Sequence, residues 1–374
     1  MRNVRHALGQ GGPPGLALLQ GYLAVVDDDD RLAKLAENRQ VQALESVSEH
    51  GWHLGFYSGF AGVAWASQHL DELLKSEEML GMSAELDDIV AQRVRQSPWQ
   101  EPYDLIFGLV GLGLYALDHP DQNFAADVVP QIINRLAELA QELDGGLTWW
   151  TRPGLTENRE YYPQGYYHMG VAHGIPGVIA LLGRACAAGI APDTAQRLLA
   201  GAMRWLFANR RSAGTGSIFS CLSPRCPDHK GRRSPSARSA WCYGDPGIAG
   251  ILFSTARAIG DRELEKRALD IVRHDCARPM TETGVVDATL CHGSAGLGHI
   301  YNRLYQATGD KALAHAARKW FELTLTMCPP GSVSREWESE TDLLEGMTGT
   351  ALSLLAACSA VEPRWDRAML LSSV

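Results

Sequence analysis

The sequence has 374 residues, of which 45% are hydrophobic and 21% charged. This composition is typical of a globular protein, and the length suits one large domain built from repeats. The formal net charge of −9 argues against general affinity for nucleic acid or an anionic membrane, because either would need a basic face. No apolar run is long enough to span a membrane, and the apolar stretch 16–26 lacks the cleavage site of a signal peptide. We therefore expect a cytoplasmic protein, in which clustered Cys and His indicate metal binding or catalysis before disulfides.

A short Gly-x-x-Gly element recurs along the chain, and each copy leads into an apolar stretch. The first glycines of successive copies are 49, 66, 70, 49 and 53 residues apart, which is too regular for chance. The sequence leaves open whether residues 12–46 form a seventh, degenerate repeat. The six clear copies are 59–62, 108–111, 174–177, 244–247, 293–296 and 346–349.

Each repeat is predicted to contain two helices. The first is apolar nearly all round, as in 248–256 and 350–357, and a helix without a polar face is buried. The second is amphipathic. Two of these second helices follow a Gly-Asp pair that combines a C-cap glycine with an N-cap aspartate. The predicted second helices are 121–143, 193–209, 261–272 and 310–321.

A buried helix alternating with an exposed one fits either an open solenoid or a closed ring. The first helices are apolar on both sides, which favours the closed ring. We therefore expect an all-α fold, an α/α toroid with inner and outer helices from six to seven helical hairpins. No low-complexity linker divides the chain, so residues 1–374 are expected to form a single domain.

The repeat glycines allow positions in different repeats to be compared, and this comparison reveals a candidate metal site. Cys242 and Cys291 each lie two residues before the first glycine of their repeat, and His292 lies one residue before it. Equivalent positions of successive repeats face the same axis of a toroid, so we expect these three side chains to converge. Two thiolates and one imidazole suit a tetrahedral Zn²⁺, and three protein ligands leave one position open, as in a catalytic site.

Simpler interpretations of these residues exist. A single Cys near a helix start is more often a small core residue than a ligand. The adjacency of Cys291 and His292, together with the equivalent position of Cys242, favours the metal site. A rival zinc loop has no evident fourth ligand, and its prolines and basic residues are typical of an exposed loop. This rival consists of Cys221, Cys226 and His229.

Other polar residues fall near the same positions of the repeat. His173 lies one residue before a repeat glycine, as His292 does, and is a candidate acid or base. Tyr243 occupies the equivalent position of its repeat. Asp104 lies four residues before a repeat glycine, and Arg238 lies four residues before the first candidate cysteine. The simpler interpretations of these last two are an N-cap and a loop cation.

Several of these motifs resemble the lanthionine synthetase C family, the cyclases of lanthipeptide biosynthesis. The resemblance runs from about Tyr57 to the C-terminus and is carried by 172–177 (Ala-His-Gly-Ile-Pro-Gly), 241–247 (Trp-Cys-Tyr-Gly-Asp-Pro-Gly), 291–293 (Cys-His-Gly), 344–346 (Leu-Glu-Gly) and the closing 363–371. It implies an α/α toroid with a single Zn²⁺. It further implies that the zinc ligands are Cys242, Cys291 and His292, that the acid and base are His173 and Asp104, and that Arg238 and Tyr243 are further active-site residues.

The resemblance implies that Cys thiols of a peptide add to dehydroalanine or dehydrobutyrine of the same peptide and form lanthionine or methyllanthionine rings. The implied partners are a dehydrated precursor peptide, a dehydratase and an exporter, in a complex that would hold the protein at the periphery of the membrane. The length leaves no room for a fused dehydratase, so we expect a stand-alone cyclase. His168 stands where the family often has Asn, and only 49 residues separate the first two repeat glycines, too few for an inserted domain.

Two other functions would use the same residues. Zinc would serve equally to activate glutathione, with which eukaryotic relatives of the family are associated. A non-catalytic peptide-binding scaffold with a structural zinc is the third interpretation, and it predicts a fourth protein ligand and the loss of His173 or Asp104. Both residues are present in the sequence, and no fourth ligand is evident.

Overall fold

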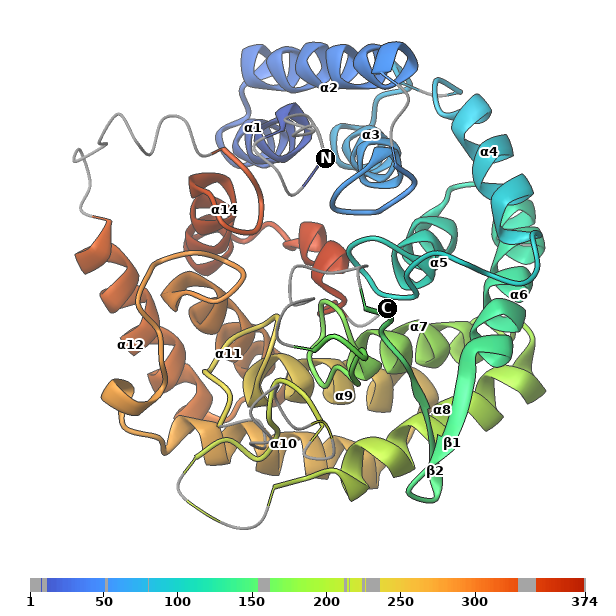
Figure 1. Ribbon diagram of the computed structural model, residues 1–374. Coiled ribbons are helices and arrows are strands. Elements are labelled where there is room, and N and C mark those ends of the chain that lie inside the picture. Colours follow the sequence, from blue (N-terminus) through green and yellow to red (C-terminus); the bar gives the residue numbers. More distant parts are fainter. Residues whose placement is uncertain are drawn as a thin grey trace.

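The computed structural model describes residues 8, 12–50, 53–79, 81–153, 162–211, 214, 216–223, 226, 236–328 and 341–372. Its helices form two concentric rings (Figure 1). The inner ring consists of α1 (Pro13–Asp27), α3 (Phe60–Leu74), α5 (Leu109–Asp118), α7 (Ile175–Ala187), α9 (Asp245–Ile259), α11 (Ser294–Thr308) and α14 (Met347–Cys358). The outer ring contains α2 (Asp30–His50), α4 (Ala84–Val94), α6 (Gln122–Leu139), α8 (Pro192–Ala208), α10 (Arg262–Cys276) and α12 (Lys311–Met327).

The inner ring is closed. Each inner helix contacts the next one, and the last, α14, contacts the first, α1. The predicted all-α toroid is therefore confirmed. The hairpin of α1 and α2 is a seventh repeat, which the sequence had left open, and residues 12–15 (Gly-Pro-Pro-Gly) are its Gly-x-x-Gly element. A closed ring also supports one domain over the whole chain, which stays a proposal.

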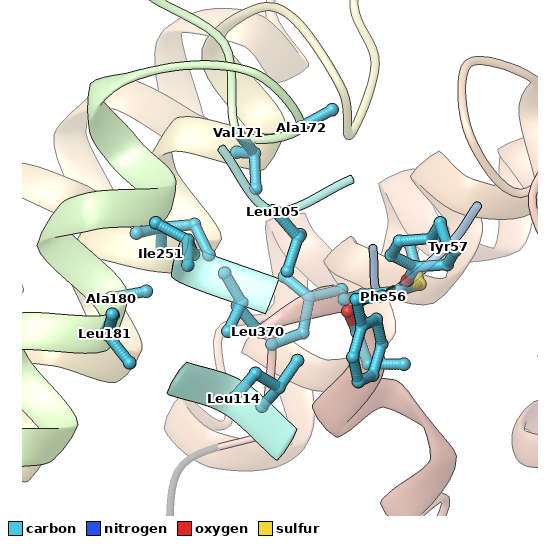
Figure 2. Close-up of a cluster of buried hydrophobic side chains, with 14 of the residues drawn as sticks. Phe56, Tyr57, Leu105, Leu114, Val171, Ala172, Ala180, Leu181, Ile251 and Leu370 are labelled. Atoms are coloured by element: carbon cyan, nitrogen blue, oxygen red, sulfur yellow. Dashed lines mark hydrogen bonds between the residues drawn. The ribbon is translucent and has the colours of Figure 1, made fainter. Parts of the chain in front are cut away.

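The repeat glycines stand at the start of the inner helices. A glycine is the N-cap residue of all seven inner helices that the structure describes. The second glycine of six copies packs against the carbonyl oxygen of the residue six positions earlier. A Cβ would lie 1.9 Å from this oxygen at Gly62 and 2.0 Å from it at Gly296, a distance that only glycine allows. The six carbonyl residues are all buried and apolar, and they join one core, part of which is drawn in Figure 2: Phe56, Leu105, Val171, Trp241, Leu290 and Leu343.

We expect Gly62→Ala to lower the free energy of unfolding by about 1–3 kcal/mol, because the added Cβ would overlap the carbonyl oxygen of Phe56. Gly15→Ala is the matched control, since Gly15 is the equivalent glycine of the first repeat and, among the residues that the structure describes, the nearest atom to its Cβ would be 3.5 Å away. This control should leave the stability unchanged or raise it by up to about 1 kcal/mol, because alanine favours a helix more than glycine does. Denaturant titration of both variants measures the difference, and an equal loss in the two would contradict the close-approach explanation.

Backbone hydrogen bonds join the loops that precede successive inner helices. The N–H of Leu105 donates to Ala172 O at 3.2 Å, and the N–H of Cys242 donates to Cys291 O at 3.3 Å. These bonds place equivalent residues of neighbouring repeats side by side, however far apart they are in the sequence. Other bonds of this kind run from Tyr57 N to Ile106 O, from Ala172 N to Cys242 O, from Trp241 N to Cys291 O, from Cys291 N to Leu344 O and from Leu343 N to Leu8 O.

The end of the chain lies at the centre of the ring, where the short 3-10 helix η3 (Arg364–Met369) is visible in red (Figure 1). The indole Nε1 of Trp241 donates to Met369 O at 2.9 Å, and the hydroxyl of Tyr57 donates to Ala368 O at 2.8 Å. Asp366 is fully buried between His299 and Arg303 of α11, with Oδ2 3.0 Å from Nε2 of the histidine. The closing segment therefore holds the loops on which the candidate site is built.

One predicted helix is too long. The sequence predicts an outer helix over 121–143, but α6 ends at Leu139, and Ala140–Leu143 form strand β1, which pairs antiparallel with β2 (Gly146–Trp149). Asp144 and Gly145 between them both have positive φ, 55° and 74°, as a two-residue hairpin turn requires. The Gly-Asp pairs behave as predicted, with Gly260 and Gly309 in left-handed C-caps and the next aspartates capping α10 and α12. Within the described residues, no helix has the length and apolar character needed to cross a membrane.

Candidate metal centre and active site

Three side chains direct metal-binding atoms to one point in the loops before α9 and α11. The Sγ atoms of Cys242 and Cys291 and a ring nitrogen of His292 all lie within 4.8 Å of one another. The backbone hydrogen bond between the two loops, from the N–H of Cys242 to Cys291 O, brings the two thiols together. In the rest of the described chain, no other group of three His, Cys, Asp or Glu side chains meets the same condition.

The charges of these three side chains depend on one another. The Cys291 thiol, and after it His292, lowers the pKa of Cys242 to about 6, although burial opposes this change. Hydrogen bonding to Cys242 in turn raises the pKa of His292 and raises the pKa of Cys291 well above its usual value. The cluster therefore holds a thiolate at neutral pH, beside protons that a divalent cation would displace.

A carboxylate and an imidazole form a second pair nearby. Nδ1 of His173 lies 2.6 Å from Oδ2 of Asp104, and Oδ1 of Asp104 accepts the backbone N–H of Phe107 at 2.8 Å. The carboxylate is held on both sides and its side chain is 6% exposed, whereas that of His173 is 24% exposed. Because a carboxylate only accepts, it keeps the proton on Nδ1, so that Nε2 carries the basic lone pair of the ring. The simpler interpretation of Asp104 as an N-cap is wrong, since the N-cap residue of α5 is Gly108.

Tyr243 lies beside this pair. Its ring centroid is 6.5 Å from that of His173, and its hydroxyl lies 3.2 Å from Nδ1 of His168. Burial raises the pKa of Tyr243 well above its usual value and lowers the pKa of His168 well below its own. Both groups are therefore neutral at physiological pH, and the Tyr243 hydroxyl keeps its proton.

Arg238 is exposed, and its charge helps to lower the pKa of Cys242, after the hydrogen bonds from Cys291 and His292. The segment from this arginine to the first cysteine is not helical, so the spacing of four residues does not correspond to one helical turn. Instead the chain turns back at Gly244, whose φ is 107°, and a Cβ there would lie 2.1 Å from the carbonyl oxygen of Arg238. This reversal brings Arg238 to the same loop region as the metal donors.

Comparison with known proteins identifies the fold and the family. The sequence matches the family model "Lanthionine synthetase C-like protein" over residues 9–370. The chain belongs to this family. The sequence resemblance is thereby confirmed, and it extends to the first repeat, which the motifs alone did not include.

Individual members of the lanthionine synthetase C-like family show the same coverage. The chain is 25% identical over 366 residues to nisin biosynthesis protein NisC of Lactococcus lactis subsp. lactis, with 92% of this chain and 83% of the relative aligned. It is 24% identical over 369 residues to glutathione S-transferase LANCL1 of Danio rerio, with 92% and 81% aligned. The solved structure of nisin cyclase superposes with a TM-score of 0.83 at 23% identity, over 99% of this chain and 93% of that one, which shows a shared fold.

The sequence analysis missed two neighbours of the candidate residues. Phe107 precedes a repeat glycine as His173 does, and its ring stacks on His173 with centroids 5.7 Å apart and planes at 24°. Its side chain is large and apolar, yet Phe107 is 36% exposed. The position in the repeat was a signal that could have identified it. Asp287 lies with Oδ2 3.4 Å from Nε2 of His292, and it falls in a loop that no repeat position marks.

The rival zinc loop is only partly described. The thiol of Cys226 is buried in a small cluster with Tyr166 and Leu222, and it accepts the backbone N–H of Tyr167 at 3.3 Å. These contacts are those of a packing cysteine. His229 lies outside the described residues, so this alternative stays untested.

Proposed function

We propose that this member of the family is a zinc-dependent lanthipeptide cyclase. It would join Cys thiols of a dehydrated precursor peptide to dehydroalanine or dehydrobutyrine residues of the same peptide. Membership of the family supports a cyclase in general. The observation that carries the specific reaction is the convergence of Cys242, Cys291 and His292 close to the Asp104–His173 pair.

The donor set fits a zinc ion. Two sulfurs and one imidazole nitrogen are ligands that Zn²⁺ prefers, and three protein ligands leave one tetrahedral position for a substrate. The pKa of Cys242, lowered to about 6, makes this ligand available at neutral pH. When bound, zinc would lower the pKa of a substrate thiol, so that a nucleophilic thiolate exists at neutral pH.

The other residues would move a proton and stabilise charge. Addition forms one carbon–sulfur bond and transfers the thiol proton to the α-carbon of the dehydro residue, so the peptide mass does not change. His173, oriented by Asp104, would accept the thiol proton or deliver a proton to the α-carbon. Arg238 and the neutral hydroxyl of Tyr243 would stabilise the enolate that develops between these events.

The substrate class implies the further partners. A dehydratase must act on the precursor peptide before this reaction, because the dehydro residues are its acceptors. We propose that the chain works in the cytoplasm with such a dehydratase and with an exporter, in a complex at the membrane surface.

Incubation with a dehydrated precursor peptide tests the proposal. Metal-loaded protein should consume the free thiols of the peptide without changing its mass. Protein treated with a chelator should leave the thiols free until Zn²⁺ is returned. Alkylation of the remaining thiols followed by mass spectrometry measures both results. Thiols that persist in the presence of zinc-loaded protein would contradict the cyclase function for that peptide.

A second candidate uses the same residues with glutathione as the thiol. It is suggested by the relative that is named a glutathione S-transferase, at 24% identity. Adding glutathione to the same incubation separates the two reactions, because a glutathione adduct raises the peptide mass whereas cyclisation leaves it unchanged. A peptide that binds and reacts in neither way would indicate a binding scaffold.

A further inference from the structure

A buried ion pair lies behind the loop that carries Arg238. Asp275 is in the last turn of α10, Arg278 follows the end of that helix, and their side chains are 1% and 3% exposed. Nη1 of Arg278 lies 3.1 Å from Oδ1 of Asp275, and the hydroxyl of Tyr301 donates to Oδ2 at 2.6 Å. Removing two charges from water costs free energy that their attraction often fails to offset. The pair therefore needs an explanation other than stability.

The hydrogen bonds of this pair go to both neighbours of Arg238. Nη1 of Arg278 donates to Oγ of Ser239 at 3.0 Å, and that hydroxyl donates to Oδ1 of Asp275 at 2.7 Å. Nη2 of Arg278 donates to the carbonyl oxygen of Ala237 at 3.3 Å. Ala237 and Ser239 are buried, whereas Arg238 between them is exposed. The backbone on each side of the exposed arginine is thus tied to the same buried charges.

The loop after α10 closes over the same point. Nη2 of Arg278 also donates to Glu282 O at 2.8 Å, at the end of the short helix η2 (Met280–Glu282). The backbone N–H of Ser239 donates to Thr283 O at 2.8 Å. Gly284 comes next with a φ of 72°, and a Cβ there would lie 3.1 Å from the Cβ of Arg238. The guanidinium of Arg278 therefore bonds both the loop that carries Arg238 and the loop after α10, next to the Cβ of Arg238.

We propose that Asp275 and Arg278 are positioning residues that hold Arg238 at the active site. They act on the backbone on both sides of Arg238, and their own side chains stay in the core. Stabilisation of developing charge requires a cation whose place is fixed before the reaction. The role given to Arg238 rests on the proposed function, whereas the way its loop is held does not.

A double-mutant cycle tests this inference. The cyclisation rates of the wild type, Arg278→Met, Arg238→Ala and the double variant are compared. We expect Arg278→Met to lower kcat by about 10²-fold with little change in KM or zinc content, the effect of a misplaced catalytic group. In the Arg238→Ala background the same substitution should have no further effect, because the group that it positions is gone. An equal fall in both backgrounds, or no fall in the wild-type background, would overturn the positioning role.

Two further variants keep the test decisive. Ser239→Ala retains the ion pair and removes only the Ser239 hydroxyl, which is hydrogen-bonded to both Arg278 and Asp275. This variant replaces Arg278→Met if Arg278→Met does not fold. It should lower kcat by about tenfold in the wild-type background alone. Arg184→Met is the matched control, since it breaks a partly buried ion pair with Asp118, with side chains 17% and 7% exposed, at the far ends of α7 and α5. Any effect of this control should be equal in both backgrounds.

Trypsin gives a readout that does not depend on the reaction. Cleavage after Arg238, mapped by mass spectrometry, should become about tenfold faster in Ser239→Ala, because the loop has lost hydrogen bonds that hold it against the core. Cleavage at the wild-type rate would overturn the inference. If the wild type does not cyclise the peptide at all, the proposed function fails, and the trypsin result still decides whether the loop is held in this way.

Discussion

Cys291→Ala is expected to reduce the zinc content of the purified protein from stoichiometric to near zero. The two remaining donors, Cys242 and His292, hold a zinc ion too weakly to keep it through purification. The substitution also removes the thiol that lowers the pKa of Cys242, so the remaining cysteine becomes a poorer ligand at neutral pH. Inductively coupled plasma mass spectrometry of the wild type and the variant measures the difference.

The fold should survive this substitution. The bonds from Cys242 N to Cys291 O and from Cys291 N to Leu344 O use backbone atoms only, and alanine retains them. Circular dichroism should therefore be unchanged, apart from a lower melting temperature as the stabilisation by bound zinc is lost. Cys221→Ala is the matched control and should keep the metal, because Cys221 is outside the donor set. If Cys291→Ala retains zinc and Cys221→Ala loses it, the metal is bound by the rival loop instead.

His173→Ala is expected to lower kcat by about 10²–10⁴-fold, the contribution of a positioned acid or base. Zinc content should stay the same, because His173 is not among the metal donors. Asp104→Asn should also lower kcat, since an amide no longer keeps the proton on Nδ1 of the imidazole. Initial rates on a dehydrated peptide, measured with the zinc content of each variant, test these expectations.

The exposed His315 on the outer helix α12 provides the control for these variants. His315→Ala should cyclise the peptide at the wild-type rate. A wild-type rate in His173→Ala would show that this residue is not the acid or base of the reaction. A parallel loss of zinc would instead show that the substitution disturbs the metal centre.

The toroid and the convergence of the metal donors were predictable for the same reason. Both follow from the repeat glycines, because each glycine marks where the chain passes closely over the start of an inner helix. Gly62 and Gly296 show this close approach. The first repeat was less clear in the sequence, because its Gly-x-x-Gly element at 12–15 has prolines at both central positions.

Features that depend on contacts between loops were not predictable. The hairpin of β1 and β2 was hidden by the helical periodicity of 121–143, although the Asp144-Gly145 pair between the strands is a sequence signal for a two-residue hairpin turn. The ion pair of Asp275 and Arg278 joins the end of one helix to a loop, and no repeat position marks it. The contact of Asp104 with His173 was implied by the family resemblance alone, because it depends on the backbone hydrogen bond between the loops of Leu105 and Ala172.

The central position of η3 sets an order for the folding of the chain during its synthesis. The N-terminal repeats leave the ribosome first, but the N–H of Trp365 that bonds the hydroxyl of Tyr22 comes 343 residues later. The carbonyl of Met369 that fixes Trp241, next to the first candidate metal ligand, emerges 128 residues after the tryptophan. A nascent chain therefore exposes both cysteines and the histidine of the metal centre long before it can fix their geometry. Completion of the site is delayed until η3 has been synthesised.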